Sequence, residues 1–381
     1  MKIKTYDAVC PQEYLSAYGL DPDRVIYFDI ETTGFRAASS SLYMIGWAVS
    51  AASCRAPSGS GQGQPDEMPD CTRWRVTQIM AQSHGEEPVL LKQFSDLLKD
   101  YDAIIEFNGD RFDLPYMKEK YAEYGMDDPF RTLKTVDLYQ EIRPWKKALG
   151  LDRLNQKSVE EFLRIRRTDP FHGGELIDVY RSVRDHRCPD PEEALHALFL
   201  HNYEDILGMM KMTPLLAYSL AMQSSSPASV RVTSEDDQVE LDASFPLPAA
   251  VPKPLSLDIE DFCSIALSQR TARISIRALS GCLYHFFPDW QNYDYLPFED
   301  TAIHRSISSF VDPSHREKAK ARNCYVKKKG VFLPLAGNIE TPVFHRYYRD
   351  SVRWFEYRPG MEGDSVRFSV YLHELVRAAF S

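Results

Sequence analysis

The sequence predicts an α/β fold: a mixed sheet of three antiparallel strands followed by parallel strands, flanked by helices, with a smaller C-terminal α+β domain. Three observations predict it. Strand-like runs follow one another near the N-terminus, apolar strands and amphipathic helices then alternate, and a polar stretch separates this region from the rest of the chain. Consecutive strands favour antiparallel pairing, whereas β/α alternation is typical of parallel strands covered by helices.

The antiparallel part of the sheet is predicted by three apolar runs, Val25–Phe28, Tyr43–Ser50 and Trp74–Met80. The second and third runs are separated by residues 51–70, AASCRAPSGSGQGQPDEMPD. Ser, Gly, Gln and Pro dominate this segment, and such a composition disfavours packed structure. We therefore expect an antiparallel meander whose second connection is a long mobile loop.

The alternating part begins with residues 87–98, where apolar residues at 90, 91, 94, 97 and 98 follow a helical period. A buried strand, Ala103–Phe107, and a helix starting near Phe112 come next. The strand Leu133–Val136 follows and ends at Asp137, which we interpret as the N-cap of another helix. Strand and helix therefore alternate after the meander, as parallel strands require.

Two capping boxes predict later helices. Ser158 is followed by Glu161, and Asp190, which precedes a proline, is followed by Glu193. A small polar residue with Glu three positions later satisfies the free N–H groups of a first helical turn.

The polar stretch suggests the domain organisation. We expect a first domain at 1–222, a linker at 223–250 and a C-terminal accessory domain at 251–381. Residues 252–381 contain 18 Lys and Arg and 15 Asp and Glu, a net charge of +3. The whole chain has a net charge of −10, so residues 1–251 have a net charge of −13. An acidic first part argues against general affinity for polyanions unless its acids hold metal ions.

Composition excludes several classes of protein. The 381 residues are 44% hydrophobic and 26% charged, which is typical of soluble globular proteins. The start, MKIKTYDAVC, has no signal-peptide pattern, and no segment reaches the roughly 20 apolar residues of a membrane helix. Seven scattered cysteines without a CxxC pair indicate no disulfide framework. We expect a cytoplasmic protein with reduced thiols, no membrane and no disulfide partner.

Two carboxylates follow the first predicted strand. Asp29 and Glu31, in YFDIETTGF, are two residues apart and therefore point to one face of an extended chain. The pair alone carries little information, because the acidic content of this chain gives roughly eight such pairs by chance.

Two further segments place acids where they can join this pair. In EFNGDRFDLPY, residues 106–116, an Asn-Gly turn after a strand leads to Asp113 at a helix start. In LFLHNYEDILGMM, residues 198–210, His201 and Asp205 are four apart and share a helical face. The alternatives are a helix-start acid for Asp113, favoured by the helix dipole, and a core or surface histidine for His201.

Together these motifs resemble a known family. The series D-I-E-T-T-G, F-N-G-x-x-F-D-x-P and H-N-x-x-D resembles the ribonuclease-H-like superfamily of DEDD 3′–5′ exonucleases, in particular its YprB-like branch of predicted nucleases. The resemblance covers about residues 24–215 and includes VDLYQEIRPW, residues 136–145. The three motifs occur in the family's order, so the resemblance is stronger than any one of them.

The resemblance implies a site that holds two Mg²⁺ or Mn²⁺ ions. Its four ligands are Asp29, Glu31, Asp113 and Asp205. Such hard cations prefer carboxylate oxygen, and four acids gathered without them would repel one another.

His201 is expected to orient or deprotonate the attacking water. The chain departs from the family here, because His201 stands at the usual tyrosine spacing and Leu200 at the usual histidine spacing. Tyr203 is two residues from Asp205 and would face away from it on a helix. The other motif residues are expected to contact substrate, namely Thr32, Thr33, Gly34 and Asn108.

The function that this resemblance implies is metal-dependent 3′–5′ exonuclease activity on the 3′ end of single-stranded DNA or RNA. Two alternatives remain open: a non-catalytic nucleic-acid-binding or scaffold protein on the same fold, and a structure-specific endonuclease. The motifs neither distinguish DNA from RNA nor indicate an oligomeric state.

The C-terminal region repeats one motif without its partners. LSLDIEDF, residues 255–262, contains Asp258 and Glu260, which we interpret as solvated acids opening a helix after Pro254. A strand, Gln269–Leu279, and a cluster of aromatic residues precede a basic run, HREKAKARNCYVKKKG, at 315–330. Such a combination is typical of single-strand binding, or equally of a solvated basic segment beside an aromatic core.

Overall fold

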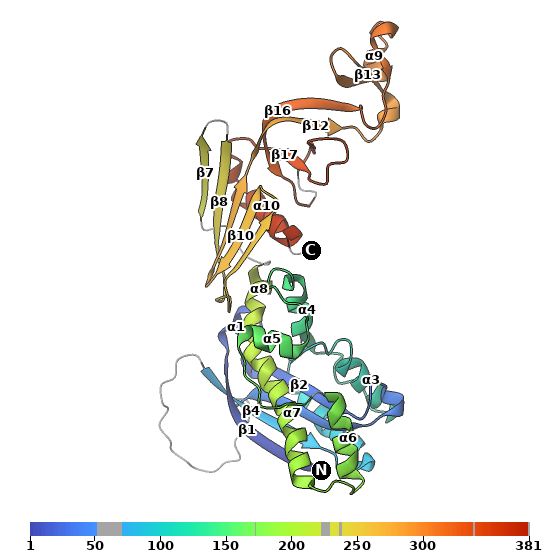
Figure 1. Cartoon of the computed structure of the whole chain (residues 1–381), viewed down its shortest axis with the longest axis vertical. Helices are drawn as coiled ribbons and strands as arrows, with labels where there is room; N and C mark the ends of the chain where they lie inside the picture. The colour runs from blue at the N-terminus through green and yellow to red at the C-terminus, as the bar shows by residue number, and fades with distance from the viewer. Residues whose placement is uncertain (52–70, 172, 222–228, 236–237, 338–339, 380–381) are drawn as a thin grey trace. The chain divides into compact units, whose positions relative to one another are not determined.

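A computed structural model of the chain describes residues 1–51, 71–171, 173–221, 229–235, 238–337 and 340–379 (Figure 1). Nearly all of the predicted loop 51–70 and the first part of the predicted linker lie outside these residues. The chain forms two compact units, Met1–Leu220 with Pro248–Pro252 and Ala221–Leu247 with Lys253–Ser381. None of the described helices is long and apolar enough to span a membrane.

The first unit contains a six-stranded sheet in the order β1-β4-β3-β2-β5-β6. The bounds of its strands are β1 Lys2–Pro11, β2 Val25–Thr32, β3 Leu42–Ser50, β4 Cys71–Met80, β5 Ala103–Glu106 and β6 Lys134–Asp137. Strands β1, β4, β3 and β2 pair antiparallel, whereas β5 and β6 extend the sheet from β2 in parallel. The predicted mixed sheet, antiparallel first and then parallel, is confirmed.

Helices cover both faces of this sheet (Figure 1). Their bounds are α1 Glu13–Ala17, α2 Glu87–Leu98, α3 Asp113–Glu123, α4 Leu138–Ile142, α5 Gln156–Leu163, α6 Gly173–Arg184, α7 Pro191–Met212 and α8 Leu216–Ala221. On one face, Phe28 of β2 and Phe94 of α2 share a core cluster with Met117 of α3. On the other, Met44 of β3 packs with Phe199 of α7 and residues of α6.

The second unit contains three further sheets. Their strands are β7 Ser229–Glu235, β8 Gln238–Pro246, β9 Leu255–Ile259, β10 Cys263–Ser268, β11 Thr271–Arg277, β12 Leu279–Phe286, β13 Tyr293–Leu296, β14 Thr301–His304, β15 Glu317–Lys318, β16 Tyr325–Pro334 and β17 Trp354–Glu356. The sheet orders are β7-β8-β11-β10-β9, β12-β16-β17 and β14-β13-β15. Two described helices, α9 Arg305–Ser308 and α10 Ser365–Ala379, complete this α+β unit.

Several sequence predictions about local structure hold. Asp137 caps α4 by accepting a hydrogen bond from the backbone N–H of Tyr139. Asp190 caps α7 in the same way with Glu193. Helix α3 begins directly after Phe112.

Other predictions are wrong. Residues 229–235 and 238–246, placed in the linker, are strands that pair with each other. Asp258 lies in strand β9 and not in a helix, because Leu255 and the residues after it pair with β10. Ser158 does not cap a helix, since α5 starts at Gln156 and Asn155 accepts the capping hydrogen bond.

Candidate active site

Strand β2 carries Asp29 and Glu31 on the face that α7 covers. The predicted strand ended at Phe28, but β2 continues to Thr32, with Asp29 opposite Gly46 and Glu31 opposite Met44 of β3. Both acids therefore project from within the sheet and not from beyond its end. Residues two apart share a face, so Phe28 and Ile30 point to the opposite core.

Gly46 allows α7 to approach these acids closely. A Cβ atom at Gly46 would lie 2.0 Å from Oδ1 of Asn202 and 2.4 Å from Cδ1 of Ile206. In this space the amide of Asn202 donates to Oδ2 of Asp29 at 2.7 Å and accepts from Nε2 of Gln78 at 2.8 Å. The glycine thus lets the helix rest on the sheet with an amide group holding Asp29.

Asp113 reaches the site from the turn after β5. Asn108 adopts a left-handed conformation, φ 62°, and its N–H donates to Asp137 at 2.8 Å. The turn closes when the N–H of Leu114 donates to the carbonyl of Gly109 at 3.0 Å. Asp113 is then the first residue of α3 and is buried.

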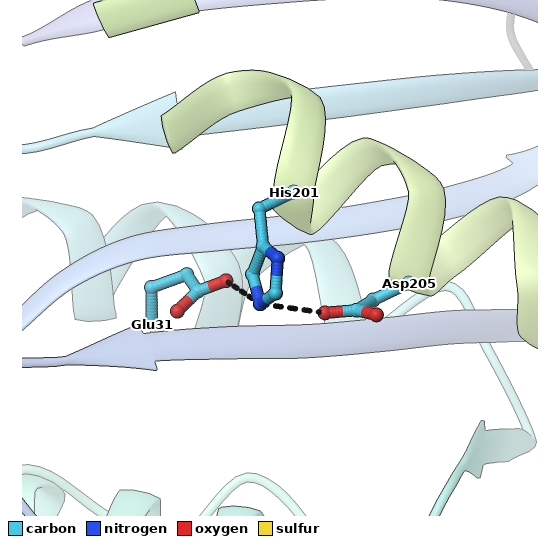
Figure 2. Close-up of side chains that lie close together, drawn as sticks. All are labelled: Glu31, His201 and Asp205. Carbon is cyan, nitrogen blue, oxygen red and sulfur yellow. Dashed lines mark ion pairs between the residues drawn. The ribbon is translucent and has the colours of Figure 1, made fainter. Parts of the chain in front are cut away.

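Helix α7 contributes His201 and Asp205. Figure 2 shows both side chains pointing toward Glu31 from successive turns of the helix. Nε2 of His201 lies 3.4 Å from Oδ2 of Asp205 and 3.9 Å from Oε1 of Glu31. These three residues each offer a ligand atom within 4.8 Å of the others, an arrangement that could hold a metal ion.

The imidazole of His201 is oriented by a residue that the sequence did not reveal. Nδ1 of His201 lies 2.5 Å from Oδ2 of Asp169, whose side chain is inaccessible to solvent. An ionised carboxylate only accepts hydrogen bonds, so Nδ1 carries the proton and Nε2 faces the acids. Burial alone would lower the pKa of His201, but Asp205, Glu31 and Asp169 raise it.

Arg167 is a second residue that the motifs did not reveal. Its Nη1 donates to Oδ1 of Asp205 at 2.7 Å and to Oε1 of Glu160 at 3.1 Å. Asp169 and Glu204 lie within 3.6 and 3.7 Å of the same guanidinium, which is 10% exposed. One buried cation therefore balances part of this negative charge and leaves Oδ2 of Asp205 turned toward the histidine.

Burial and neighbouring acids raise the pKa of three carboxylates of the site, Asp29, Glu31 and Asp113. Burial raises the pKa of Glu31 to about 8, and the charges of Asp205 and Asp113 add to the rise. Burial also raises the pKa of Asp113 to about 7. The pKa of Asp29 lies well above its usual value, first because of burial and then because of the other three carboxylates. The four acids are therefore close enough to interact, and Arg167, which contacts Asp205, offsets only part of their negative charge.

The structure also locates the residues expected to contact substrate. Thr32 donates to the carbonyl of Gly34 at 2.9 Å, and the hydroxyl of Thr33 accepts from the N–H of Ser41 at 2.8 Å. Both threonine side chains are buried and hold the loop after β2. Asn108 lines an open groove together with His201 and Asp205.

This groove has a volume of about 670 Å³. Its wall contains two cations, Arg111 and Lys157, and two aromatic rings, Phe107 and Tyr139. The Arg111 guanidinium lies 5.6 Å from the centre of the Tyr139 ring. The acidic site thus opens into a depression that offers both positive charge and aromatic surface.

Comparison with known proteins agrees with this fold. Residues 26–217, half of the chain, match the RNase H superfamily, and the chain belongs to that superfamily. The domain therefore has a nuclease fold, which confirms the family expected from the three motifs.

Two DNA polymerases show similarity to this chain. Over 41 residues the chain is 46% identical to a DNA polymerase of Methanocaldococcus jannaschii. These residues make up 11% of the length of this chain and 2% of the length of that protein. The structure of the family B DNA polymerase from the hyperthermophilic archaeon Pyrobaculum calidifontis is similar with a TM-score of 0.35 and 14% identity. That similarity covers 72% of this chain and 35% of the polymerase. The matched regions thus span 2% of the first polymerase and about a third of the second.

Proposed function

We propose that this protein is a metal-dependent 3′–5′ exonuclease of the YprB-like branch, acting on single-stranded DNA or RNA. The observation that carries the proposal is the convergence of Asp29, Glu31, Asp113 and Asp205 from three separate segments. Each of Asp29, Glu31 and Asp113 has a pKa raised by burial and by at least one other member of the set.

The four carboxylates suit two Mg²⁺ or Mn²⁺ ions. Carboxylate oxygen is the ligand that these hard cations prefer, and bound cations would remove the mutual repulsion that raises the pKa values. When bound, two such cations supply Lewis-acid activation of a water molecule and stabilise charge on the leaving 3′ oxygen of a phosphodiester.

His201 acts beside the carboxylates as a proton acceptor. Asp169 holds the Nδ1 proton, so the lone pair at Nε2 faces the groove where water enters. The acids that raise the pKa of His201 favour its protonated form, and cations held by those acids would offset this effect. The neutral imidazole would then orient the attacking water and receive its proton at Nε2. Arg167 fixes Asp205 and so keeps the distance between this carboxylate and the imidazole.

The groove supports a polyanionic substrate. Arg111 and Lys157 offer contacts for phosphate groups, and Tyr139 offers a ring for base stacking. Positive charge on the wall of the groove offsets the acidic floor, so the backbone of a single strand is held while its terminal phosphodiester lies over the carboxylates.

The test is digestion of end-labelled single-stranded DNA and RNA by the full chain in Mn²⁺. We expect stepwise shortening from the 3′ end, which Asp113→Asn abolishes and which Asp127→Asn, the same change at an exposed position of the same unit, leaves intact. Intact 3′ ends would contradict the proposal. Cleavage of a circular single strand would instead identify an endonuclease, and binding without turnover would identify a non-catalytic protein.

A further inference from the structure

Strands β12 and β16 of the second unit form a long antiparallel ribbon (Figure 1). In its register Tyr284 stands opposite Lys327, Phe286 opposite Tyr325, and Cys282 opposite Lys329. Directly opposed residues share a face, as do residues two apart on one strand. One face of the ribbon therefore carries aromatic side chains on both strands at one end and lysines on β16 toward the other end.

The aromatic rings on this face form a continuous row. The Tyr325 ring centre lies 4.9 Å from that of Tyr284 and 5.4 Å from that of Phe286. Phe286 in turn lies 5.4 Å from Tyr348, which is 38% exposed. The interplanar angles of the Tyr325 pairs are 76° and 79°, so the rings meet edge to face. Such pairs cover at most one face of one ring and leave π-surface for a further stacking partner.

Cations border the row. Lys329 and Arg349 are exposed, and among the described residues neither forms an ion pair with a carboxylate. The Arg349 guanidinium lies 5.3 Å from the centre of the Tyr348 ring. Asp300 accepts hydrogen bonds from both Tyr325 and Lys327, and so holds this edge of the row in place.

Another surface of the same unit has the opposite charge. A hollow of about 420 Å³ on the five-stranded sheet has five acids and one arginine as its charged lining residues, namely Glu240, Asp242, Asp258, Glu260, Asp261 and Arg277. A polyanion would be repelled there and attracted to the aromatic and basic face of the ribbon. The distribution of charge over the second unit therefore favours nucleic-acid binding at the ribbon face and not at the acidic hollow.

We propose that this ribbon face, formed by Tyr284, Phe286, Tyr325, Tyr348, Lys329 and Arg349, binds single-stranded nucleic acid. Unpaired bases stack on the aromatic row, and the phosphates between them contact Lys329 and Arg349. The identity of the ligand rests on the proposed nuclease function, whereas the surface belongs to the second unit and shares no residue with the catalytic groove. A single strand fits better than a duplex, because only unpaired bases expose their faces to the rings.

The experiment measures binding of a fluorescent 20-nucleotide single strand to the full chain in chelator, which prevents cleavage. Lys329→Glu with Arg349→Glu is expected to weaken binding at least tenfold. It should also reduce the slope of log affinity against log salt by about 0.7 for each phosphate that the protein no longer neutralises. Tyr348→Ala is expected to weaken binding about fivefold, as removal of one stacking partner predicts.

Matched controls lie elsewhere in the second unit. Arg273→Glu makes the same charge change at an exposed position of β11, and Phe310→Ala removes an aromatic ring that is 91% exposed. Both are expected to bind like the unchanged protein. Equal losses of affinity in the controls, or no loss in the ribbon variants, would overturn the proposal. If the ribbon variants lose as much affinity for a blunt duplex as for the single strand, the proposed stacking of bases is wrong.

The outcome is independent of catalysis. If the protein cleaves 3′ ends in Mn²⁺ but the ribbon variants bind the single strand with unchanged affinity, this proposal is refuted and the proposed function stands. Binding that depends on the ribbon face in a protein that never cleaves 3′ ends would support this surface and refute the proposed function.

Discussion

Two segments of this chain contain the same letters, D-I-E, after an apolar residue, and differ in what the fold packs around them. Asp29 and Glu31 lie in β2, where helix α7 covers them. Asp258 lies in β9, is exposed, and pairs through its backbone with Ser264 of a neighbouring strand. Both aspartates lie in strands, but Glu31 lies within β2 whereas Glu260 lies in the turn after β9, with φ 49°.

The difference lies in what the fold brings to each strand. Asp29 and Glu31 meet Asp113 and Asp205, which are distant in sequence, and their pKa values rise accordingly. Asp258 lies in an open hollow with other exposed acids, where water screens their repulsion. A short motif therefore predicts chemistry only when other elements deliver its partners.

The largest expected effect is on catalysis. Asp29→Asn should lower the rate of 3′-end hydrolysis about a thousandfold, which corresponds to about 4 kcal/mol of lost transition-state stabilisation. Asp258→Asn should leave the rate within about twofold, because that acid has no catalytic partners. Initial rates on a labelled single strand in Mn²⁺ check both. Similar losses of hydrolysis rate in the two variants would contradict the different roles assigned to Asp29 and Asp258.

The next effect concerns Arg167, the cation that contacts the acids around the candidate active site. Arg167→Gln leaves several buried acids without their counter-charge, and should lower the free energy of unfolding by about 3 kcal/mol or more. Arg24→Gln removes an exposed pair with Asp102 and should change stability little. Urea denaturation compares the two variants. A stable Arg167→Gln protein would show that the buried ion pairs contribute nothing.

The packing of α7 on the sheet predicts a smaller effect. Gly46→Ala places a Cβ against Asn202 and Ile206 and should lower stability by about 1–3 kcal/mol, as overpacking does. It should also reduce activity, because the amide of Asn202 is displaced from Asp29. Gly281→Ala is the control, since a Cβ there meets no atom within 4 Å. Equal thermal unfolding midpoints for the two variants would contradict the close approach of α7 to β3 at Gly46.

The smallest effect within any one pH unit is a pH dependence of stability near the Asn108 turn. Burial, and then the charge of Asp137, raise the pKa of Glu106 to about 9 from a usual value of 4.5. An acid whose pKa is raised on folding stabilises fully below its unfolded pKa. That contribution is lost as pH rises through the folded pKa, here between about 4.5 and 9, at up to one proton or about 1.4 kcal/mol per pH unit.

Glu106→Gln keeps a neutral side chain at this position and should flatten the fall of stability with pH over that window. Urea denaturation at several pH values measures the slope for each protein. Parallel slopes for the variant and the unchanged chain would show that Glu106 does not titrate in this range.

The fold of the first unit was predictable where strands are buried on both faces. Continuous apolar runs marked β2 and β3, and alternation with helices marked the parallel strands. Strand β1, KIKTYDAVCP, was missed because it is an edge strand with many exposed polar residues. Strands β7 and β8 were missed because their polar composition resembles that of a linker, and only pairing with each other makes them strands.

The site was predictable in part for a similar reason. The acids occur in motifs with fixed spacing, and the structure brings all four together. Asp169 and Arg167 lie between α5 and α6 in RIRRTDP, where no periodicity or motif marks them, and only the fold places them beside His201 and Asp205. The role of Gly46 likewise depends on where α7 packs.

The central claim is that acids from three distant segments form one metal site, and Mn²⁺ binding tests it most directly. Titration of the full chain, with free Mn²⁺ followed by electron paramagnetic resonance, should show two bound ions. Asp113→Asn should lower the affinity or the number of bound ions, and Asp258→Asn should change neither. Absence of saturable binding, or equal losses in both variants, would contradict the account.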